Sequence, residues 1–168
     1  MNLEEYIRDV PDFPKKGIIF KDITPLLSDY KAFDACSAQL LDLVEGSIDK
    51  VVSIDARGFF FGGILAKSLE AGFIPVRKKG KLPSETIEES YSLEYGEDVL
   101  QIHKDAIKPG DRVLLHDDVL ATGGTAQAVC KLIERLGGKV VQCNFIIQLD
   151  FLNGAEKLSA PVKSVINY

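Results

Sequence analysis

The chain has 168 residues, 46% of them hydrophobic and 27% charged, and a net charge of -5. This size and composition are those of a single globular domain, residues 1–168, with one proper core. The acidic balance argues against nucleic-acid binding, which usually needs a basic face.

Neither a targeting segment nor a membrane span is predicted. The acidic N-terminus lacks the basic and apolar parts of a signal peptide. The longest apolar stretch, residues 58–66, is stopped by Lys67 and is too short to span a bilayer. We therefore expect a cytoplasmic protein that binds neither nucleic acid nor membrane.

Helices and strands alternate along the chain. Helices are predicted over residues 2–10, 31–45, 59–71 and 125–136, and strands over 51–54, 73–77, 112–116 and 139–149. Residues 78–90 are polar and predict a long mobile loop, with two more strands following it up to residue 103. Strands that read as apolar runs between helices predict an α/β fold with a central, mostly parallel sheet and helices on both faces.

Residues 113–125, VLLHDDVLATGGT, carry the strongest functional signal. They combine a strand, an acidic pair, a short loop and a helix start. Glycines let the backbone approach a ligand, and the free N–H groups and dipole of a helix N-terminus favour a phosphate. No lysine follows the glycines, so this is not a P-loop for a triphosphate. The predicted phosphate loop comprises Ala121, Thr122, Gly123, Gly124 and Thr125.

The acidic pair is Asp117 and Asp118. Adjacent carboxylates near a sheet core need partners, and a sugar with two neighbouring hydroxyls or a magnesium ion would satisfy them. Neighbours in a strand point to opposite faces, so the two need not play equal parts. The alternative is a plain strand-to-helix turn with an acidic cap, but the full order of features favours function.

This segment closely resembles the 5-phosphoribosyl-1-pyrophosphate signature of the type I phosphoribosyltransferases. The resemblance extends from residue 11 to about 149 and implies that family's fold, with a small hood from residues 1–30 and a flexible lid loop at about 78–96. It also implies that Asp117 and Asp118 hold the ribose and that Ala121 to Thr125 hold the 5-phosphate. The family is usually homodimeric, so we expect a homodimer.

A second strand-to-helix turn, IDARGF, spans residues 54–59. Arg57 offers a planar set of donors suited to phosphate oxygens, although a surface arginine near a helix cap is the alternative. The turn resembles the pyrophosphate loop of the family, which often holds a cis peptide bond outside proline. We place that bond at Asp55–Ala56. Many relatives have glutamate where this chain has Asp55.

Residues 77–96 resemble the hood loop of the adenine-specific members of the family, in which KGKLP and SYSLEYG are typical. The resemblance implies that Lys78 and Lys81 help to hold pyrophosphate. Glu94 would approach the imidazole edge of the base and transfer its proton, and Tyr95 would help to close the lid. Taken alone, the segment also fits a solvated loop and a hairpin.

Residues 13–27 resemble the segment that covers the base in the same family. Apolar Ile19 and Phe20 can sandwich a flat purine. Lys21 stands where the family often has arginine, and it keeps the charge but loses the planar fork. An edge strand that packs on the core is an alternative compatible with this role.

The resemblance implies a purine salvage enzyme that transfers the 5-phosphoribosyl group from phosphoribosyl pyrophosphate to N9 of adenine. AMP and pyrophosphate would form through an oxocarbenium-like transition state, with Glu94, Asp117 and Asp118 as catalytic residues. Mg²⁺ is the expected cofactor, held mainly by pyrophosphate rather than by side chains. Three alternatives stay open: another base, a non-catalytic regulator that senses phosphoribosyl pyrophosphate, and a plain nucleotide-binding scaffold.

Cysteine and histidine carry no predicted chemistry. Cys36, Cys130 and Cys143 lack metal-ligand spacing, and we expect buried, reduced thiols. His116 takes a strand position where an apolar residue is usual, and we expect a hydrogen-bonded core residue.

Overall fold

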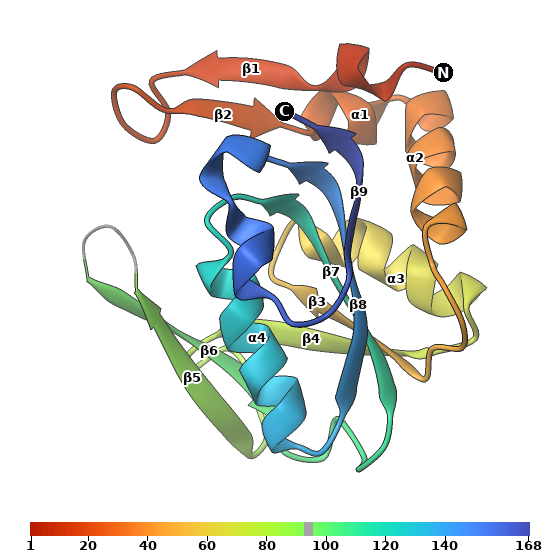
Figure 1. The fold of residues 1–168 in the computed structure, drawn as a ribbon, viewed down its shortest axis with the longest axis vertical. Coiled ribbons are helices and arrows are strands. Elements are labelled where there is room, and N and C mark those ends of the chain that lie inside the picture. Colours follow the sequence, from red (N-terminus) through yellow and green to blue (C-terminus); the bar gives the residue numbers. More distant parts are fainter. Residues whose placement is uncertain (93–95) are drawn as a thin grey trace.

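The computed structural model describes residues 1–92 and 96–168. The strands of its central sheet are β3 (Lys50–Ile54), β4 (Gly72–Lys78), β5 (Thr86–Ser92), β6 (Glu97–His103), β7 (Arg112–Leu120), β8 (Lys139–Gln148) and β9 (Val162–Asn167). They form a seven-stranded sheet in the order β5-β6-β4-β3-β7-β8-β9 (Figure 1). The pairs among β3, β4, β7, β8 and β9 are parallel, whereas β6 runs antiparallel to β4 and β5. The predicted mostly parallel sheet is confirmed.

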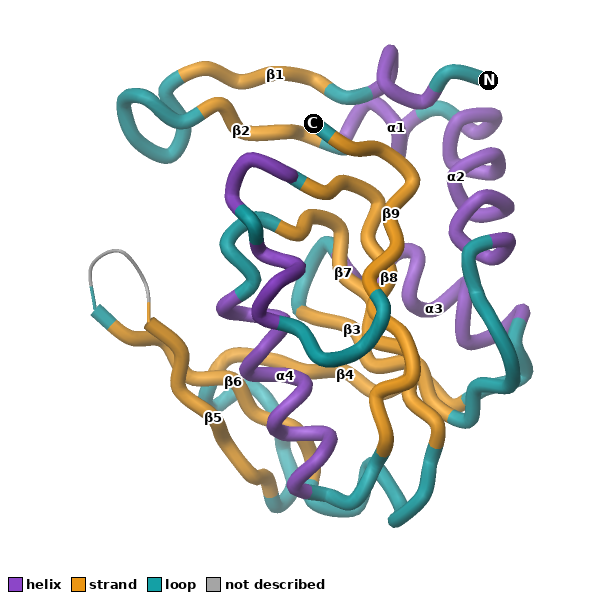
Figure 2. Tube along the Cα trace, viewed as in Figure 1, coloured by secondary structure: helices purple, strands orange, loops and turns teal. Residues whose placement is uncertain are grey.

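Helices cover both faces of this sheet, as predicted (Figure 2). The α-helices are α1 (Thr24–Ser28), α2 (Tyr30–Asp42), α3 (Gly58–Ser68) and α4 (Gly124–Arg135), and the 3-10 helices are η1 (Leu3–Tyr6), η2 (Asp150–Leu152) and η3 (Gly154–Lys157). α4 packs in one buried cluster with residues of β5 and β6, and α1, α2 and α3 pack in a second cluster. The sheet therefore lies between two apolar layers.

The central strands explain why their sequences read as unbroken apolar runs. Val51 and Leu114 belong to the cluster of α2 and α3, whereas Val52 and Leu115 belong to the cluster of α4. Since neighbouring side chains of a strand point to opposite faces, a strand covered on both sides needs apolar residues at successive positions.

The hood contains a small antiparallel sheet, in which β1 (Arg8–Pro11) pairs with β2 (Ile19–Asp22) (Figure 1). The helix predicted over residues 2–10 is wrong beyond Tyr6, because only residues 3–6 are helical. Pairing with β2 gives residues 8–11 the backbone partners that a helix would have supplied. A local pattern does not reveal partners that lie beyond an intervening loop, from Ile19 to Asp22.

Among the other boundaries that differ from the sequence prediction, two bear on the site. β7 continues to Leu120, so Asp117 and Asp118 lie within the strand rather than after it, because β8 is long enough to pair with Asp117, Val119 and Leu120. β5 begins at Thr86 and pairs with β6, so the loop that follows β4 comprises residues 79–85 and is shorter than predicted.

None of the helices in residues 1–92 and 96–168 combines the length and apolar character that crossing a bilayer requires.

The three cysteines are buried free thiols, as expected. His116 is fully buried, and its Nδ1 lies 3.1 Å from the carbonyl oxygen of Asn144. Its Nε2 has no hydrogen-bond partner among the described residues, so the expected hydrogen bonding is only half realised.

Burial makes His116 a source of acid sensitivity, since it lowers the pKa of this imidazole from 6.5 to about 4. The folded protein keeps the ring neutral in a pH range where the unfolded chain binds a proton, so protonation favours unfolding. We expect this group to lower the free energy of unfolding by on the order of 3 kcal/mol as the pH falls through that window.

Urea unfolding of the His116→Leu variant across the same pH range tests this expectation. The wild type should lose more stability on acidification than the variant, whereas His103→Gln should behave as the wild type does. Parallel pH profiles for the wild type and His116→Leu would contradict the role of His116.

Candidate active site

A cavity of about 850 Å³ opens where β7 and β8 end. Carboxyl ends of parallel strands are where α/β sheets bind ligands. Segments from the hood, the turn after β3, the end of β7 and the C-terminal part of the chain meet in its wall. The predicted site residues that line it are Ile19, Phe20, Lys21, Arg57, Asp117, Asp118, Ala121, Thr122, Gly123 and Thr125.

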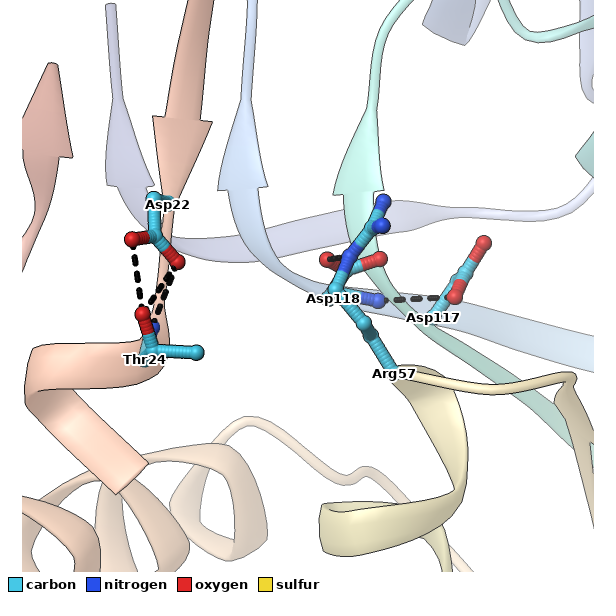
Figure 3. Close-up of polar contacts among 5 residues, drawn as sticks. All are labelled: Asp22, Thr24, Arg57, Asp117 and Asp118. Atoms are coloured by element: carbon cyan, nitrogen blue, oxygen red, sulfur yellow. Dashed lines mark hydrogen bonds and ion pairs between the residues drawn. The ribbon is translucent and has the colours of Figure 1, made fainter. Parts of the chain in front are cut away.

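Asp118 and Arg57, which both line this cavity, form an ion pair (Figure 3). Asp118 is only 2% exposed, and Nε of Arg57 donates a hydrogen bond to its Oδ2 atom. Partial burial opposes the charged guanidinium, but the carboxylate of Asp118 outweighs it and raises the pKa of Arg57. The ion pair gives this nearly buried carboxyl group a counter-charge and holds it in one orientation.

Asp117 has a different environment from its neighbour. Its Oδ1 accepts a hydrogen bond from the backbone N–H of Asp118 at 2.9 Å. Burial and the charge of Asp118 raise the pKa of Asp117 well above its usual range. A Cβ atom on Gly58 would lie 2.8 Å from Oδ1 of Asp117, so the glycine of the DARG turn leaves room for this carboxyl group. The two acids are therefore chemically unequal.

The predicted phosphate loop joins β7 to α4. Gly123 is the N-cap of α4 and has φ = 81°, a left-handed conformation that favours glycine. Gly123 has no side chain, so the N-cap residue makes no side-chain hydrogen bond to the first N–H groups of α4. This is the arrangement in which a helix N-terminus binds an anion.

The hood places an aromatic ring beside the ion pair. The guanidinium carbon of Arg57 lies 5.2 Å from the centroid of the Phe20 ring, and Phe13 packs edge-on against the same ring. Ile19 is 56% exposed at the rim. An aromatic ring next to a guanidinium group provides a surface for a flat base and a positive charge for the phosphate of an attached sugar.

Polar contacts order the hood locally and join it to Tyr168. Asp22, where β2 ends, accepts hydrogen bonds from the hydroxyl of Thr24 at 2.6 Å and from its N–H at 2.9 Å, and these bonds lower the pKa of Asp22 (Figure 3). Lys21 Nζ lies 2.7 Å from Oδ1 of Asp9 and 3.7 Å from the centre of the Tyr168 ring. Lys21 thus joins the two hood strands to β9.

The remaining predicted residues are placed differently. Lys78, Lys81 and Gly124 do not line the cavity. Nζ of Lys78 lies 2.7 Å from Oδ2 of Asp98 in the β6 strand. Glu94 and Tyr95 lie outside the described residues.

The turn after β3 contains the predicted cis peptide bond at Asp55–Ala56. Asp55 Oδ2 accepts a hydrogen bond from Nε of Arg77 at 2.9 Å and lies 3.6 Å from Nζ of Lys81. Arg77 was missed by the sequence reasoning, although it opens the basic RKKGK stretch. Several C-terminal cavity residues were also missed, and no motif marks them: Leu149, Phe151, Leu152 and Tyr168.

The chain closely matches known proteins. A sequence model of the phosphoribosyl transferase domain matches residues 22–167. The adenine phosphoribosyltransferase of Flavobacterium johnsoniae is 59% identical over 170 residues, with 100% of both chains covered.

Solved structures agree with this match. The crystal structure of the adenine phosphoribosyltransferase from Thermoanaerobacter pseudethanolicus is 52% identical, with a TM-score of 0.96 over 99% of this chain and 100% of that one. The enzyme of Saccharomyces cerevisiae, solved with an imino-altritol bisphosphate and adenine, is 42% identical, with a TM-score of 0.90 over 97% and 96% of the two chains. The chain therefore belongs to the phosphoribosyltransferase family, among the adenine phosphoribosyltransferases.

Proposed function

We propose that this cavity binds phosphoribosyl pyrophosphate and adenine together and transfers the 5-phosphoribosyl group to N9 of adenine. The observation that carries the proposal is the convergence of an acidic pair, an arginine, a glycine-rich helix start and an aromatic plate in one cavity. A non-catalytic regulator has less support, because relatives that match the whole chain are named as enzymes.

The proposed binding mode follows the order of groups along the cavity wall. The N–H groups and hydroxyls of residues 121–125 hold the 5-phosphate. Asp117 and Asp118 accept hydrogen bonds from the ribose hydroxyls. A guanidinium has five N–H donors, so the pairing of Arg57 Nε with Asp118 leaves donors for pyrophosphate oxygens. Phe20 and Ile19 cover the base.

The proposed mechanism is electrostatic and positional. As pyrophosphate departs, the ribose develops positive charge, and the carboxylates held beside it favour that charge. Arg57 neutralises the pyrophosphate that leaves. The hood excludes water, which would otherwise capture the sugar cation.

Magnesium is part of this proposal. Mg²⁺ would be held mainly by pyrophosphate oxygens rather than by side chains, and the carboxylates of Asp117 and Asp118 in the same cavity are hard oxygen donors compatible with that ion. Across the described ranges no three acidic, cysteine or histidine side chains cluster in a way that could hold a metal. Bound magnesium would neutralise charge on the leaving pyrophosphate.

Four residues enter the proposal by family resemblance. Lys78 and Lys81 would bind pyrophosphate, Glu94 would transfer a proton at the base, and Tyr95 would close the lid. Lys81 has structural support, because its ammonium lies beside Asp55 in the turn that carries Arg57. A homodimer in the cytoplasm completes the proposal.

Base selectivity is the first test. Adenine, hypoxanthine, guanine and xanthine are each offered with phosphoribosyl pyrophosphate and magnesium, and nucleotide formation is followed. We expect kcat/KM for adenine to exceed that for the other bases by at least about 100-fold. Turnover of another base would overturn the adenine assignment, and binding of phosphoribosyl pyrophosphate without turnover would favour the regulator.

The ion pair predicts the effect of removing one charge. Asp118→Asn keeps the shape but leaves Arg57 without its counter-charge, so kcat/KM for phosphoribosyl pyrophosphate should fall on the order of 100-fold. Asp117→Asn should have a smaller effect, because burial and the charge of Asp118 raise the pKa of Asp117 and so disfavour its charged form. Asp111→Asn, before the opposite end of β7, is the matched control. Equal activity of Asp118→Asn and this control would contradict the role of the ion pair.

Glu94 is tested by separating turnover from binding. Glu94→Ala should lower kcat on the order of 100-fold while KM changes little, because proton transfer matters only in the transition state. Glu97→Ala, at a nearby acidic position in the sequence, serves as the control. A loss divided equally between kcat and binding would argue against proton transfer by Glu94.

A further inference from the structure

We infer that Gly154 is a positioning residue for the phosphate loop, and that it acts through direct backbone contact with Ala121 to Gly123. This inference deepens the proposed function, because it rests on that loop as the phosphate site. The contact is made by the turn of residues 153–157, called the buttress turn here, which includes η3.

The two backbones touch with no room for a side chain. A Cβ atom added to Gly154 would lie 2.2 Å from the carbonyl oxygen of Ala121, 2.9 Å from the nitrogen of Gly123 and 3.0 Å from the carbonyl carbon of Thr122. Seen from the other side, a Cβ atom on Gly123 would lie 2.3 Å from the carbonyl oxygen of Gly154. Both glycines are therefore required at this contact.

Space, rather than backbone conformation, explains the glycine at 154. Gly123 has a left-handed φ, but Gly154 is not among the residues with positive φ. Alanine at 154 would be acceptable for the turn itself and would even reduce the entropy of the unfolded chain. Its methyl group would clash with backbone atoms, and a backbone cannot relieve a clash by changing rotamer as a side chain can.

The buttress turn is anchored on both sides. Before it, the N–H of Asn153 donates to the carbonyl oxygen of Asp150 at 3.0 Å, and Asp150 accepts hydrogen bonds from Gln148 and Asn167 where β8 and β9 end. After it, Nε2 of Gln127 in α4 donates to the carbonyl oxygen of Lys157 at 3.3 Å. Ala155 and Leu158 pack against the cluster covered by α4.

Because the buttress turn is anchored, we expect the phosphate loop, rather than the turn, to move when the two backbones clash. The buttress turn is tied to two strands and a helix, whereas residues 121–123 lie between β7 and α4 without regular structure. A methyl group on Gly154 therefore displaces the loop, and the nearest N–H is that of Gly123, a proposed phosphate donor. Small displacements of a binding group are enough to weaken catalysis strongly.

The test is a comparison of Gly154→Ala with Gly63→Ala, whose added methyl group in α3 meets nothing within 4 Å. We expect Gly154→Ala to raise KM for phosphoribosyl pyrophosphate at least about 10-fold and to weaken binding of ribose 5-phosphate to a similar extent. KM for adenine and the melting temperature should stay close to those of Gly63→Ala. A folded Gly154→Ala variant with unchanged KM for phosphoribosyl pyrophosphate would overturn the inference.

Two further variants keep the inference testable. Asp150→Ala loosens the anchor without touching the loop and should also raise KM for phosphoribosyl pyrophosphate, so an unchanged value would overturn the inference even if Gly154→Ala does not fold. Thr125→Val tests the loop itself. If Thr125→Val weakens ribose 5-phosphate binding and Gly154→Ala does not, the inference fails and the proposed function stands. If neither variant weakens that binding, both fail.

Discussion

A buried carboxylate at the end of a strand is the constraint on which the site depends. Asp118 lies near the end of β7, a strand between β3 and β8, and because it is almost fully buried it needs a counter-charge. Because β3 runs parallel to β7 and lies next to it, the turn after β3 reaches the same edge and supplies Arg57. Gly58 in that turn leaves the room that Asp117 needs. The parallel order of the strands thus assembles an acid pair and its cation from two distant segments.

The wall of the cavity is built partly from the N-terminal hood and partly from the C-terminal part of the chain. The hood contributes Phe20 from β2, and the C-terminal part of the chain contributes Tyr168 beyond β9. Lys21 connects them, since its ammonium contacts both Asp9 and the ring of Tyr168. The buttress turn lies in the same C-terminal part, behind the phosphate loop. Tyr168 and Gly154 belong to no recognisable motif, yet they contact Lys21 and the phosphate loop, which do.

The sequence predicts what depends on local order and misses what depends on tertiary contact. The parallel sheet follows from apolar runs, and the cis bond at Asp55–Ala56 follows from family resemblance. The strand β1 was mistaken for helix, because its partner is set by the hood and not by its own pattern. The partner of Lys78 in β6 and the contact of Gly154 with the loop have no local signal. In the sequence, a glycine that is required by contact with a distant backbone segment cannot be told from any other glycine in a turn.

An anionic substrate in a protein of net charge -5 raises a question of electrostatics. The cations near the turn already have carboxylate partners: Arg57 pairs with Asp118, and Arg77 and Lys81 lie beside Asp55. If pyrophosphate binds as proposed, it shares these cations with protein carboxylates, and the net gain in binding free energy from charge alone is reduced. In the proposed binding mode the 5-phosphate contacts backbone N–H groups and a helix dipole, which need no charged side chain. Affinity for the substrate then depends on the fixed geometry of the loop more than on total charge, which is why a neutral contact such as that of Gly154 can matter as much as a lysine.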